Sequence, residues 1–281
     1  MTMQQQIAST LGVQSTIDPA AEVERRVKFL ADYLVNTDAR GYVLGISGGQ
    51  DSTLAGRLCQ MAVEQVRHMK ERYGDGIGVN EPVFVAVGLP YRVQADADDA
   101  AAAMAFIKPD KSYTVNIEPA VSGVEQSLAG IFPGGLTDFN RGNVKARIRM
   151  IEQYAIAGEL GLLVVGTDHA AEAVTGFYTK FGDGACDITP LAGLTKSQGR
   201  EMLKCLGAPD RLSHKVPTAD LLDGKPGQTD EAELGLSYDT IDNYLMGQRI
   251  SPDDANSIEN KYTRTEHKRR LPVTPDDSWW K

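Results

Sequence analysis

A glycine-rich loop that carries a carboxylate and two hydroxyl groups follows an apolar run near the start of the chain. The loop is Ser47-Gly48-Gly49-Gln50-Asp51-Ser52, directly after residues 42–46. Adjacent glycines let the backbone approach a ligand, and the N–H groups at the start of the next helix attract phosphate. Because Asp51 would repel a bare phosphate, we expect it to bind Mg²⁺ together with the phosphates. The alternative is an ordinary turn between a strand and a helix.

A second group of polar side chains follows another apolar run, residues 162–165. It comprises Thr167, Asp168, His169 and Glu172. His169 and Glu172 are three residues apart and could share a metal ion, but two ligands are few for zinc. Mg²⁺ held by Glu172 together with Asp51 and bound phosphates is therefore the preferred interpretation. A helix start capped by Thr167 or Asp168 is the alternative.

Composition limits the classes of protein to which the chain can belong. Its 281 residues are 42% hydrophobic and 24% charged, which is typical of globular proteins, and we expect a single domain over 1–281. A formal charge of −9 argues against general binding of nucleic acid. Three cysteines without a Cys-x-x-Cys pair give no support to a disulfide framework or a zinc ribbon. The first six residues lack the basic region and the apolar core of a signal peptide, and no apolar run has membrane-spanning length. We therefore expect a soluble, cytoplasmic protein.

The elements that must position these residues alternate between strands and helices. Apolar runs predict strands at 42–46, 83–87, 115–117 and 162–165. Helical spacing predicts helices from Asp18-Pro19, from near Ser52, at 98–107, from 138 to about 159, and around 238–247. This alternation predicts an α/β fold: a doubly wound, Rossmann-like parallel sheet with helices on both faces. Ligands bind at the carboxyl ends of such strands, so the loops after residues 46, 87 and 165 should build one site.

The helix from Asn140 has an apolar stripe and an arginine on its flank. The stripe, which we expect to face the core, consists of Val144, Ile148, Ile151 and Ala155. Arg147 lies with Met150 and Tyr154 on the flank, a pattern that indicates burial against another subunit. An exposed arginine that lays its stem on an apolar surface is the alternative.

The loop at 47–52 does not end in the Gly-Lys-Ser/Thr of the Walker A motif. It resembles the phosphate loop of the ATP pyrophosphatases, which adenylate a substrate oxygen and release pyrophosphate. Further blocks, in family order up to Arg270, resemble bacterial NAD synthetase. They are Leu89-Pro90-Tyr91 with Gln94 and Asp96, Asp138 with Gly142-Asn143 and Lys145-Ala146-Arg147, residues 167–199, Pro217-Thr218-Ala219-Asp220-Leu221, and Thr265-Glu266-His267-Lys268-Arg269.

The resemblance implies an adenine nucleotide alpha-hydrolase-like fold and an ammonia-dependent ligase. Such an enzyme adenylates the nicotinate carboxylate of deamido-NAD, and ammonia then displaces AMP to give NAD. The residues implied to contact ATP are Gly45, Ile46, Ser47, Gly48, Gly49, Gln50, Asp51, Ser52, Gln94, Thr167, Lys196 and Thr218. Those implied to contact deamido-NAD are Tyr33, Arg147, Lys180, Asp187, His267 and Lys268.

The same resemblance implies the catalytic groups and the partners. Asp51 and Glu172 would bind Mg²⁺, while Lys196 would neutralise charge as pyrophosphate leaves. Asp187 is a candidate base near the attacking ammonia. The protein would be a homodimer whose interface holds deamido-NAD, with no nucleic-acid or membrane partner.

Several of these residues have plainer interpretations when each is taken alone. Lys196 could be a solvated lysine at a helix start, and residues 267–270 could be a solvated basic patch. The stretch 215–228 contains Thr218 without clear periodicity, and we expect a lid that orders when ATP binds. Gly88 stands where the family would have arginine, which puts one ATP contact in doubt; Arg92 is a possible substitute.

Two other functions compete with amidation of deamido-NAD by ammonia. Another ATP pyrophosphatase would amidate or thiolate a different substrate, yet neither paired cysteines nor a basic face is evident. A non-catalytic nucleotide sensor would not need Asp51, Glu172 and Lys196 together. Use of glutamine by the chain itself is not expected, because it has no room for a glutaminase domain and Thr2, not cysteine, follows Met1.

Overall fold

The fold is built on a parallel sheet whose strand order places the first strand in the middle. A computed structural model describes residues 1–280 except 38, 74–80, 93–96, 218–223 and 225–227. The strands are β1 (Gly41–Gly45), β2 (Val83–Gly88), β3 (Lys111–Thr114) and β4 (Leu163–Val164). Their order is β3-β2-β1-β4, all parallel, with Tyr42 beside Phe84 on one side and Leu163 on the other. The chain therefore reverses its direction of winding between β1 and β4, where ligands bind in such sheets.

Both faces of the central strands are buried, so these strands are apolar throughout. Tyr42 and Leu44 enter the core on one face of β1, and Val43 enters the core on the other. On β2, Phe84 likewise enters the core on the first face and Val85 enters the core on the second. This pattern is typical of a parallel sheet covered by helices on both sides.

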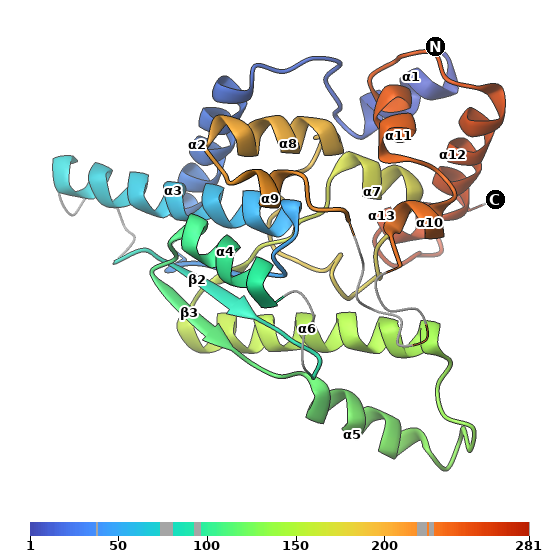
Figure 1. Cartoon of the computed structure of the whole chain (residues 1–281), viewed down its shortest axis with the longest axis horizontal. Coiled ribbons are helices and arrows are strands. Elements are labelled where there is room, and N and C mark those ends of the chain that lie inside the picture. The colour runs from blue at the N-terminus through green and yellow to red at the C-terminus, as the bar shows by residue number, and fades with distance from the viewer. Residues whose placement is uncertain (38, 74–80, 93–96, 218–223, 225–227, 281) are drawn as a thin grey trace.

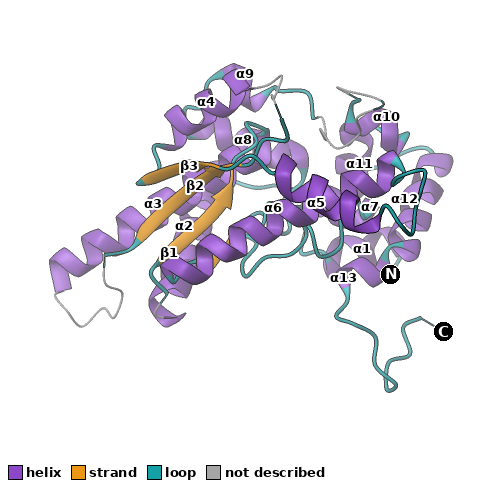
Figure 2. Cartoon of the chain, turned by 90° about the horizontal axis from the view of Figure 1, so that it is seen from below, coloured by secondary structure: helices purple, strands orange, loops and turns teal. Residues whose placement is uncertain are grey.

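Helices cover each face of the sheet, as the alternation in the sequence predicted (Figures 1 and 2). The core on one face is formed with α2 (Pro19–Thr37), α3 (Gln50–Tyr73), α4 (Ala97–Ile107), α8 (Lys196–Cys205) and α9 (Asp210–Ser213). The core on the other face is formed with α5 (Glu118–Leu128) and α6 (Asp138–Leu160). The doubly wound α/β prediction is confirmed.

A third core lies beside the sheet and joins the two ends of the chain (Figure 1). Its helices are α1 (Met3–Thr10), α7 (Ala170–Thr175), α10 (Asp230–Leu234), α11 (Tyr238–Leu245) and α12 (Pro252–Arg264), and α13 (Glu266–Arg269) follows. Of the helices beyond residue 229, the sequence predicted only the one around 238–247. Gln4 ties the ends together by donating its side-chain amide to Tyr244 O at 2.8 Å.

The third strand was predicted at 115–117, and this position is wrong. The strand is Lys111–Thr114, and all four of its residues are exposed. The backbone N–H groups of Val115 and Ile117 instead donate to Gly88 O and Pro90 O, both at 2.9 Å. β3 is an edge strand with polar, exposed side chains, and the apolar residues lie after it.

The core face predicted for α6 is only partly right. Ile148 is buried, but Ile151 is 51% exposed and Ala155 is exposed as well. The residues of α6 that are buried are Gly142, Lys145, Ala146, Ile148 and Ala157. The stripe that begins at Val144 therefore turns away from the core along the second half of the helix and leaves apolar side chains on the surface.

Candidate active site

The glycine-rich loop connects β1 to α3, which begins at Gln50 rather than near Ser52. Gly48 has a φ of +79°, and a Cβ at this residue would lie 2.5 Å from Ala100 N. The loop is thus pressed against the first turn of α4, and only glycine fits both the backbone angle and the space.

Hydroxyl groups inside the loop fix its shape. The Ser47 and Ser52 hydroxyl groups lie 3.1 Å apart, and Gly49 N donates to Ser47 Oγ at 3.2 Å. Thr53 Oγ1 donates to Gly49 O at 2.7 Å. These hydrogen bonds hold the loop in a turn at the start of α3, where free N–H groups favour an anion.

Lys196 enters this loop from a distant part of the chain. It is the first residue of α8, is 3% exposed, and places Nζ 2.7 Å from Asp51 Oδ2. Gln50 donates its side-chain amide to Lys196 O at 2.9 Å. Nζ also lies 4.9 Å from the centroid of the Tyr238 ring. The interpretation of Lys196 as a solvated lysine is wrong, since it is a buried cation paired with the loop carboxylate.

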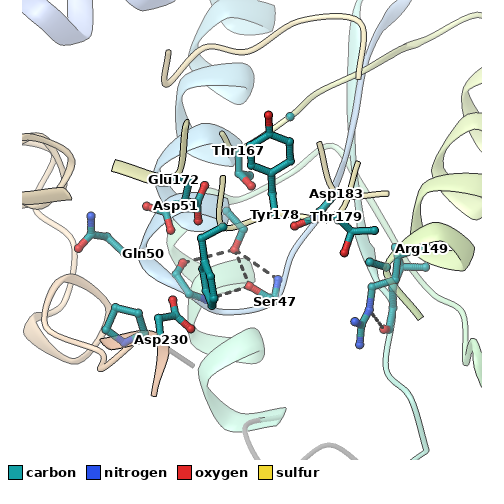
Figure 3. Close-up of a pocket in the computed structure, with 18 of the residues that line it drawn as sticks. Ser47, Gln50, Asp51, Arg149, Thr167, Glu172, Tyr178, Thr179, Asp183 and Asp230 are labelled. Carbon is teal, nitrogen blue, oxygen red and sulfur yellow. Dashed lines mark hydrogen bonds between the residues drawn. The ribbon is translucent and has the colours of Figure 1, made fainter. Parts of the chain in front are cut away.

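His169 and Glu172 complete a cluster around Asp51. Helix α7 begins at Ala170, and His169 stands at the N-cap position without a side-chain capping bond, so the interpretation of Thr167 or Asp168 as the cap is wrong. His169 Nε2 lies 3.7 Å from Asp51 Oδ1 and 3.6 Å from Glu172 Oε1. One ligand atom from each residue lies within 4.8 Å of the others. Figure 3 shows Asp51 and Glu172 on the same side of the cavity.

The charges of this cluster depend on one another. Burial alone would raise the pKa of Asp51, but the Lys196 ammonium, together with smaller effects of His169 and of hydrogen bonds, holds that pKa below its ordinary value. Burial and the nearby Asp51 charge raise the pKa of Glu172 well above its ordinary value. Burial lowers the pKa of His169 to about 4, so its imidazole is neutral at neutral pH. Two carboxyl groups that repel each other here are typical of a site that gains a cation.

The cluster forms one end of a cavity of about 390 Å³. Of the predicted site residues, those that line it are Gly45, Ile46, Ser47, Gly49, Gln50, Asp51, Ser52, Thr167, Glu172, Lys196 and Lys268. Gly48 belongs to the same loop but does not line the cavity. Gln94 and Thr218 lie outside the described residues, as does most of the lid predicted at 215–228.

A group of basic residues lies beside the cavity, between α6, the loop after α7 and α13. The Arg147 guanidinium donates to Lys180 O at 3.2 Å, and Lys180 Nζ donates to His267 O. Lys268 Nζ donates to Gly176 O and Tyr178 O, each at 2.7 Å, and lines the cavity. The structure thus brings together four residues that the sequence placed in one substrate site. Arg147 is exposed, not buried, in the single chain.

Asp187 and Tyr33 lie apart from the cavity. The Asp187 carboxylate accepts hydrogen bonds from Val164 N at 2.7 Å and from the Tyr154 hydroxyl at 3.2 Å. Tyr33 lies on α2, is 37% exposed and packs near Phe29, with ring centroids 6.4 Å apart. Neither lines the cavity. The structure therefore does not bring the candidate base Asp187 into the cavity that Asp51 lines.

Other residues that line the cavity were not singled out from the sequence. Asp183 is one of them, and its carboxylate accepts from Thr179 N at 2.7 Å. Its place between Gly182 and Gly184 is the signal that could have indicated a turn facing a ligand. Arg149 lines the cavity too and donates to Leu89 O at 3.1 Å (Figure 3). Arg92, offered as a substitute for the residue absent at position 88, pairs instead with Glu118 at 3.2 Å.

A parallel sheet with a phosphate loop and a carboxylate–lysine pair at its carboxyl edge is typical of the nucleotide-binding α/β enzymes. The family model described as NAD synthase matches residues 22–272, and the chain belongs to this family. It is 57% identical over 281 residues to the NH(3)-dependent NAD(+) synthetase of Bacillus cereus (strain 03BB102), covering 100% of both chains.

Two solved structures are similar along most of the chain. NAD+ synthetase from Burkholderia pseudomallei superposes with a TM-score of 0.79 at 45% identity, over 96% of each chain. NMN synthetase from Francisella tularensis superposes with a TM-score of 0.78 at 33% identity, over 93% of this chain and 100% of that one.

Proposed function

We propose that the chain is an ATP-dependent ligase that forms NAD from deamido-NAD and ammonia and releases AMP and pyrophosphate. Its membership of the NAD synthase family and its full-length similarity to an NH(3)-dependent NAD(+) synthetase support this activity. The observation in the structure that carries the proposal is the contact of 2.7 Å between Lys196 Nζ and Asp51 Oδ2 at the phosphate loop.

In the first step of this reaction, an oxygen of the nicotinate carboxylate attacks the α-phosphorus of ATP. A bond forms from that oxygen to phosphorus, and the bond from phosphorus to the bridging oxygen of pyrophosphate breaks. The backbone N–H groups at the start of α3 and the Lys196 ammonium stabilise the charge of the departing pyrophosphate. In the second step, ammonia attacks the acyl carbon of the adenylate, AMP leaves, and the nitrogen loses a proton. Asp183 is one of the carboxylates that line the cavity, and burial raises its pKa, which suits it to accept this proton.

Mg²⁺ fits the residues at the loop. The carboxylates of Asp51 and Glu172 provide the oxygen ligands that Mg²⁺ prefers, and phosphate oxygens would supply others. When bound, the ion neutralises phosphate charge as the bond to pyrophosphate breaks. Burial and the Asp51 charge raise the pKa of Glu172, and a cation bound between the two groups would favour the ionised carboxylate.

The basic group beside the cavity is suited to the two phosphates of deamido-NAD. Arg147, Lys180 and Lys268 would attract this dinucleotide, and His267 belongs to the same group because its backbone oxygen accepts from Lys180. Tyr33 is remote from the cavity within one chain, so its predicted contact with deamido-NAD needs a second copy of the chain. Exposed apolar side chains on α6, such as Ile151 at 51%, support a homodimer at this face.

A cytoplasmic location remains our proposal as well. No helix among the described residues is long and apolar enough to cross a lipid bilayer.

A neighbouring activity is amidation of the mononucleotide, because the similar structure from Francisella tularensis is an NMN synthetase. The acceptors of the two activities differ in size. Deamido-NAD carries an adenylate half, which the basic residues beside the cavity would bind, and nicotinate mononucleotide lacks it. Comparing deamido-NAD with nicotinate mononucleotide as acceptors separates them, and we expect a much higher kcat/KM for deamido-NAD.

The test of the proposed function is a product assay with purified protein. ATP, Mg²⁺, deamido-NAD and ammonium should give AMP and pyrophosphate in equal amounts to NAD, and omission of deamido-NAD should stop the release of AMP. Ammonium should support a higher rate than glutamine. Formation of ADP, or release of AMP without deamido-NAD, would contradict the proposal.

A further inference from the structure

His169 is a buried imidazole that the proposed reaction does not use. It is 3% exposed, and neither ring nitrogen has a hydrogen-bond partner among the described residues. Buried polar atoms in proteins are nearly always paired, so an imidazole with two unpaired nitrogens indicates a ligand. The Tyr238 ring packs beside the imidazole, with ring centroids 6.3 Å apart, and restricts its orientation.

The nitrogen Nε2 faces two carboxylates at distances that suit a shared cation. It lies 3.7 Å from Asp51 Oδ1 and 3.6 Å from Glu172 Oε1, which is too far for hydrogen bonds. Ligand atoms on one tetrahedral ion lie roughly 3.3–3.6 Å apart, because each is about 2.0–2.2 Å from the metal. All three ligand atoms lie within 4.8 Å of one another, so they must draw together to surround one ion.

The two oxygens of Asp51 have separate tasks in this arrangement. Oδ2 pairs with Lys196 Nζ at 2.7 Å, and Oδ1 is the oxygen nearer His169. The ammonium therefore does not occupy the side on which the three ligand atoms meet. When both carboxyl groups are ionised, they carry more negative charge than one ammonium can balance.

We propose that the chain without nucleotide binds one borderline divalent cation, such as Zn²⁺ or Co²⁺, through Asp51, His169 and Glu172. One imidazole nitrogen with two carboxylate oxygens, and water in a fourth position, is a ligand set that suits these ions. Mg²⁺ prefers oxygen ligands alone. His169 and Glu172 by themselves are too few ligands for zinc. Asp51, from the glycine-rich loop at the start of α3, is the third ligand. Because both carboxylates are also the proposed Mg²⁺ ligands, the two cations compete.

Co²⁺ is the probe for this site, since its visible absorption strengthens when it enters a site of low coordination number. Co²⁺ is titrated into the full chain without nucleotide, in parallel with the variants His169→Gln and His68→Gln. His68 is the matched control, because it also lies three residues before a glutamate, with Nδ1 3.2 Å from Glu71 Oε2. That pair is exposed, at 80% and 75%, and belongs to no three-residue cluster among the described residues.

We expect one equivalent of Co²⁺ to give the absorption band in the unaltered chain and in His68→Gln. In His169→Gln the dissociation constant for Co²⁺ should rise at least about tenfold, because even the loss of an outer-shell partner of a ligand weakens metal binding by this factor. A band that is unchanged in His169→Gln, or absent from the unaltered chain, would overturn the proposal. Should His169→Gln fail to fold, X-ray absorption spectroscopy of Co²⁺ bound to the unaltered chain decides: scattering from an imidazole ligand supports the site, and its absence refutes it.

The metal site and the proposed function can fail separately. The Co²⁺ band tests the three ligands without any nucleotide. Displacement of Co²⁺ by Mg²⁺ and ATP together, at concentrations where Mg²⁺ alone does not displace it, tests whether ATP and its cation share these carboxylates.

Discussion

Asp242 on α11 holds the start of the helix that carries Lys196. Its carboxylate accepts hydrogen bonds from Lys196 N at 3.1 Å and from Ser197 N at 2.7 Å, and the residue is 2% exposed. Thr195 caps the same helix by accepting from Gln198 N at 3.3 Å. The backbone from which Lys196 reaches Asp51 is therefore fixed by a helix 46 residues further along the chain.

We predict that Asp242→Asn lowers kcat about 10- to 100-fold, with a smaller change in KM for deamido-NAD. Asparagine keeps one acceptor oxygen but turns an NH₂ group toward the second N–H, so the start of α8 loosens and Lys196 loses its fixed position. Steady-state kinetics and thermal melting measure the two effects. Asp239→Asn is the control, because Asp239 lies on the same helix and is exposed. A lower melting temperature with unchanged kcat would show that Asp242 only stabilises the fold.

Asp51→Asn should retain the fold but lower turnover by about 100- to 1,000-fold, the range for loss of one electrostatic group in a reaction centre. The melting temperature should fall as well, because the buried Lys196 ammonium loses its nearest partner. In the double variant Asp51→Asn/Lys196→Met, stability should recover while turnover stays low. Release of AMP and thermal melting test both statements. Near-normal turnover in Asp51→Asn would refute the role of this carboxylate.

The positions of Asp51 and Glu172 could be predicted from the sequence because each follows an apolar strand. In a parallel sheet both strands end at one edge, so two loops far apart in the chain must meet. The contribution of α11 could not be predicted in this way. Tyr238 and Asp242 reach Lys196 only because the helices after residue 229 pack into a core with α1 and α7, and no local pattern encodes that packing.

Dependence on tertiary packing also explains which features around the cavity could not be predicted from the sequence. The burial of Lys196 and the unpaired nitrogens of His169 follow from the neighbours that surround these residues, not from their own spacing. The edge strand β3 was misplaced for a related reason. All four of its residues are exposed and polar, so it has no apolar run from which a strand could be predicted.

Gly48→Ala should destabilise the protein by about 1–3 kcal/mol and raise KM for ATP. The residue has a φ of +79°, and the added Cβ would lie 2.5 Å from Ala100 N, so the phosphate loop or α4 must shift. Gly123→Ala is the matched control: Gly123 lies in α5, and a Cβ there meets nothing within 4 Å. That variant should be neutral or slightly more stable. Urea denaturation and the KM for ATP are the measurements, and equal behaviour of the two variants would contradict the role of the loop.

Glu22→Gln should destabilise the protein by about 3–5 kcal/mol at neutral pH, because Arg26 would be left as a buried charge without its anion. Glu22 and Arg26 are each 6% exposed, and Arg26 Nε donates to Glu22 Oε1 at 2.8 Å. The Arg26 guanidinium also donates to Pro190 O and to Ala192 O, which joins α2 to the loop before α8. The control is Asp32→Asn, since Asp32 and Lys28 form a pair of the same spacing that is exposed, at 50% and 68%. Its effect should stay within about 0.5 kcal/mol.

The effect of Glu22→Gln should also depend on pH. Burial alone would raise the pKa of Glu22, but hydrogen bonding to Arg25 and the charge of Arg26 hold it below its ordinary value of 4.5. A carboxylate with a lowered pKa stabilises the fold above its ordinary pKa, and this contribution disappears as the pH falls through the lowered value. The difference in unfolding free energy between the unaltered chain and Glu22→Gln should therefore be largest near neutral pH and shrink in acid. Urea denaturation across this range measures it, and a difference that does not change with pH would mean that the ionised carboxylate does not stabilise α2.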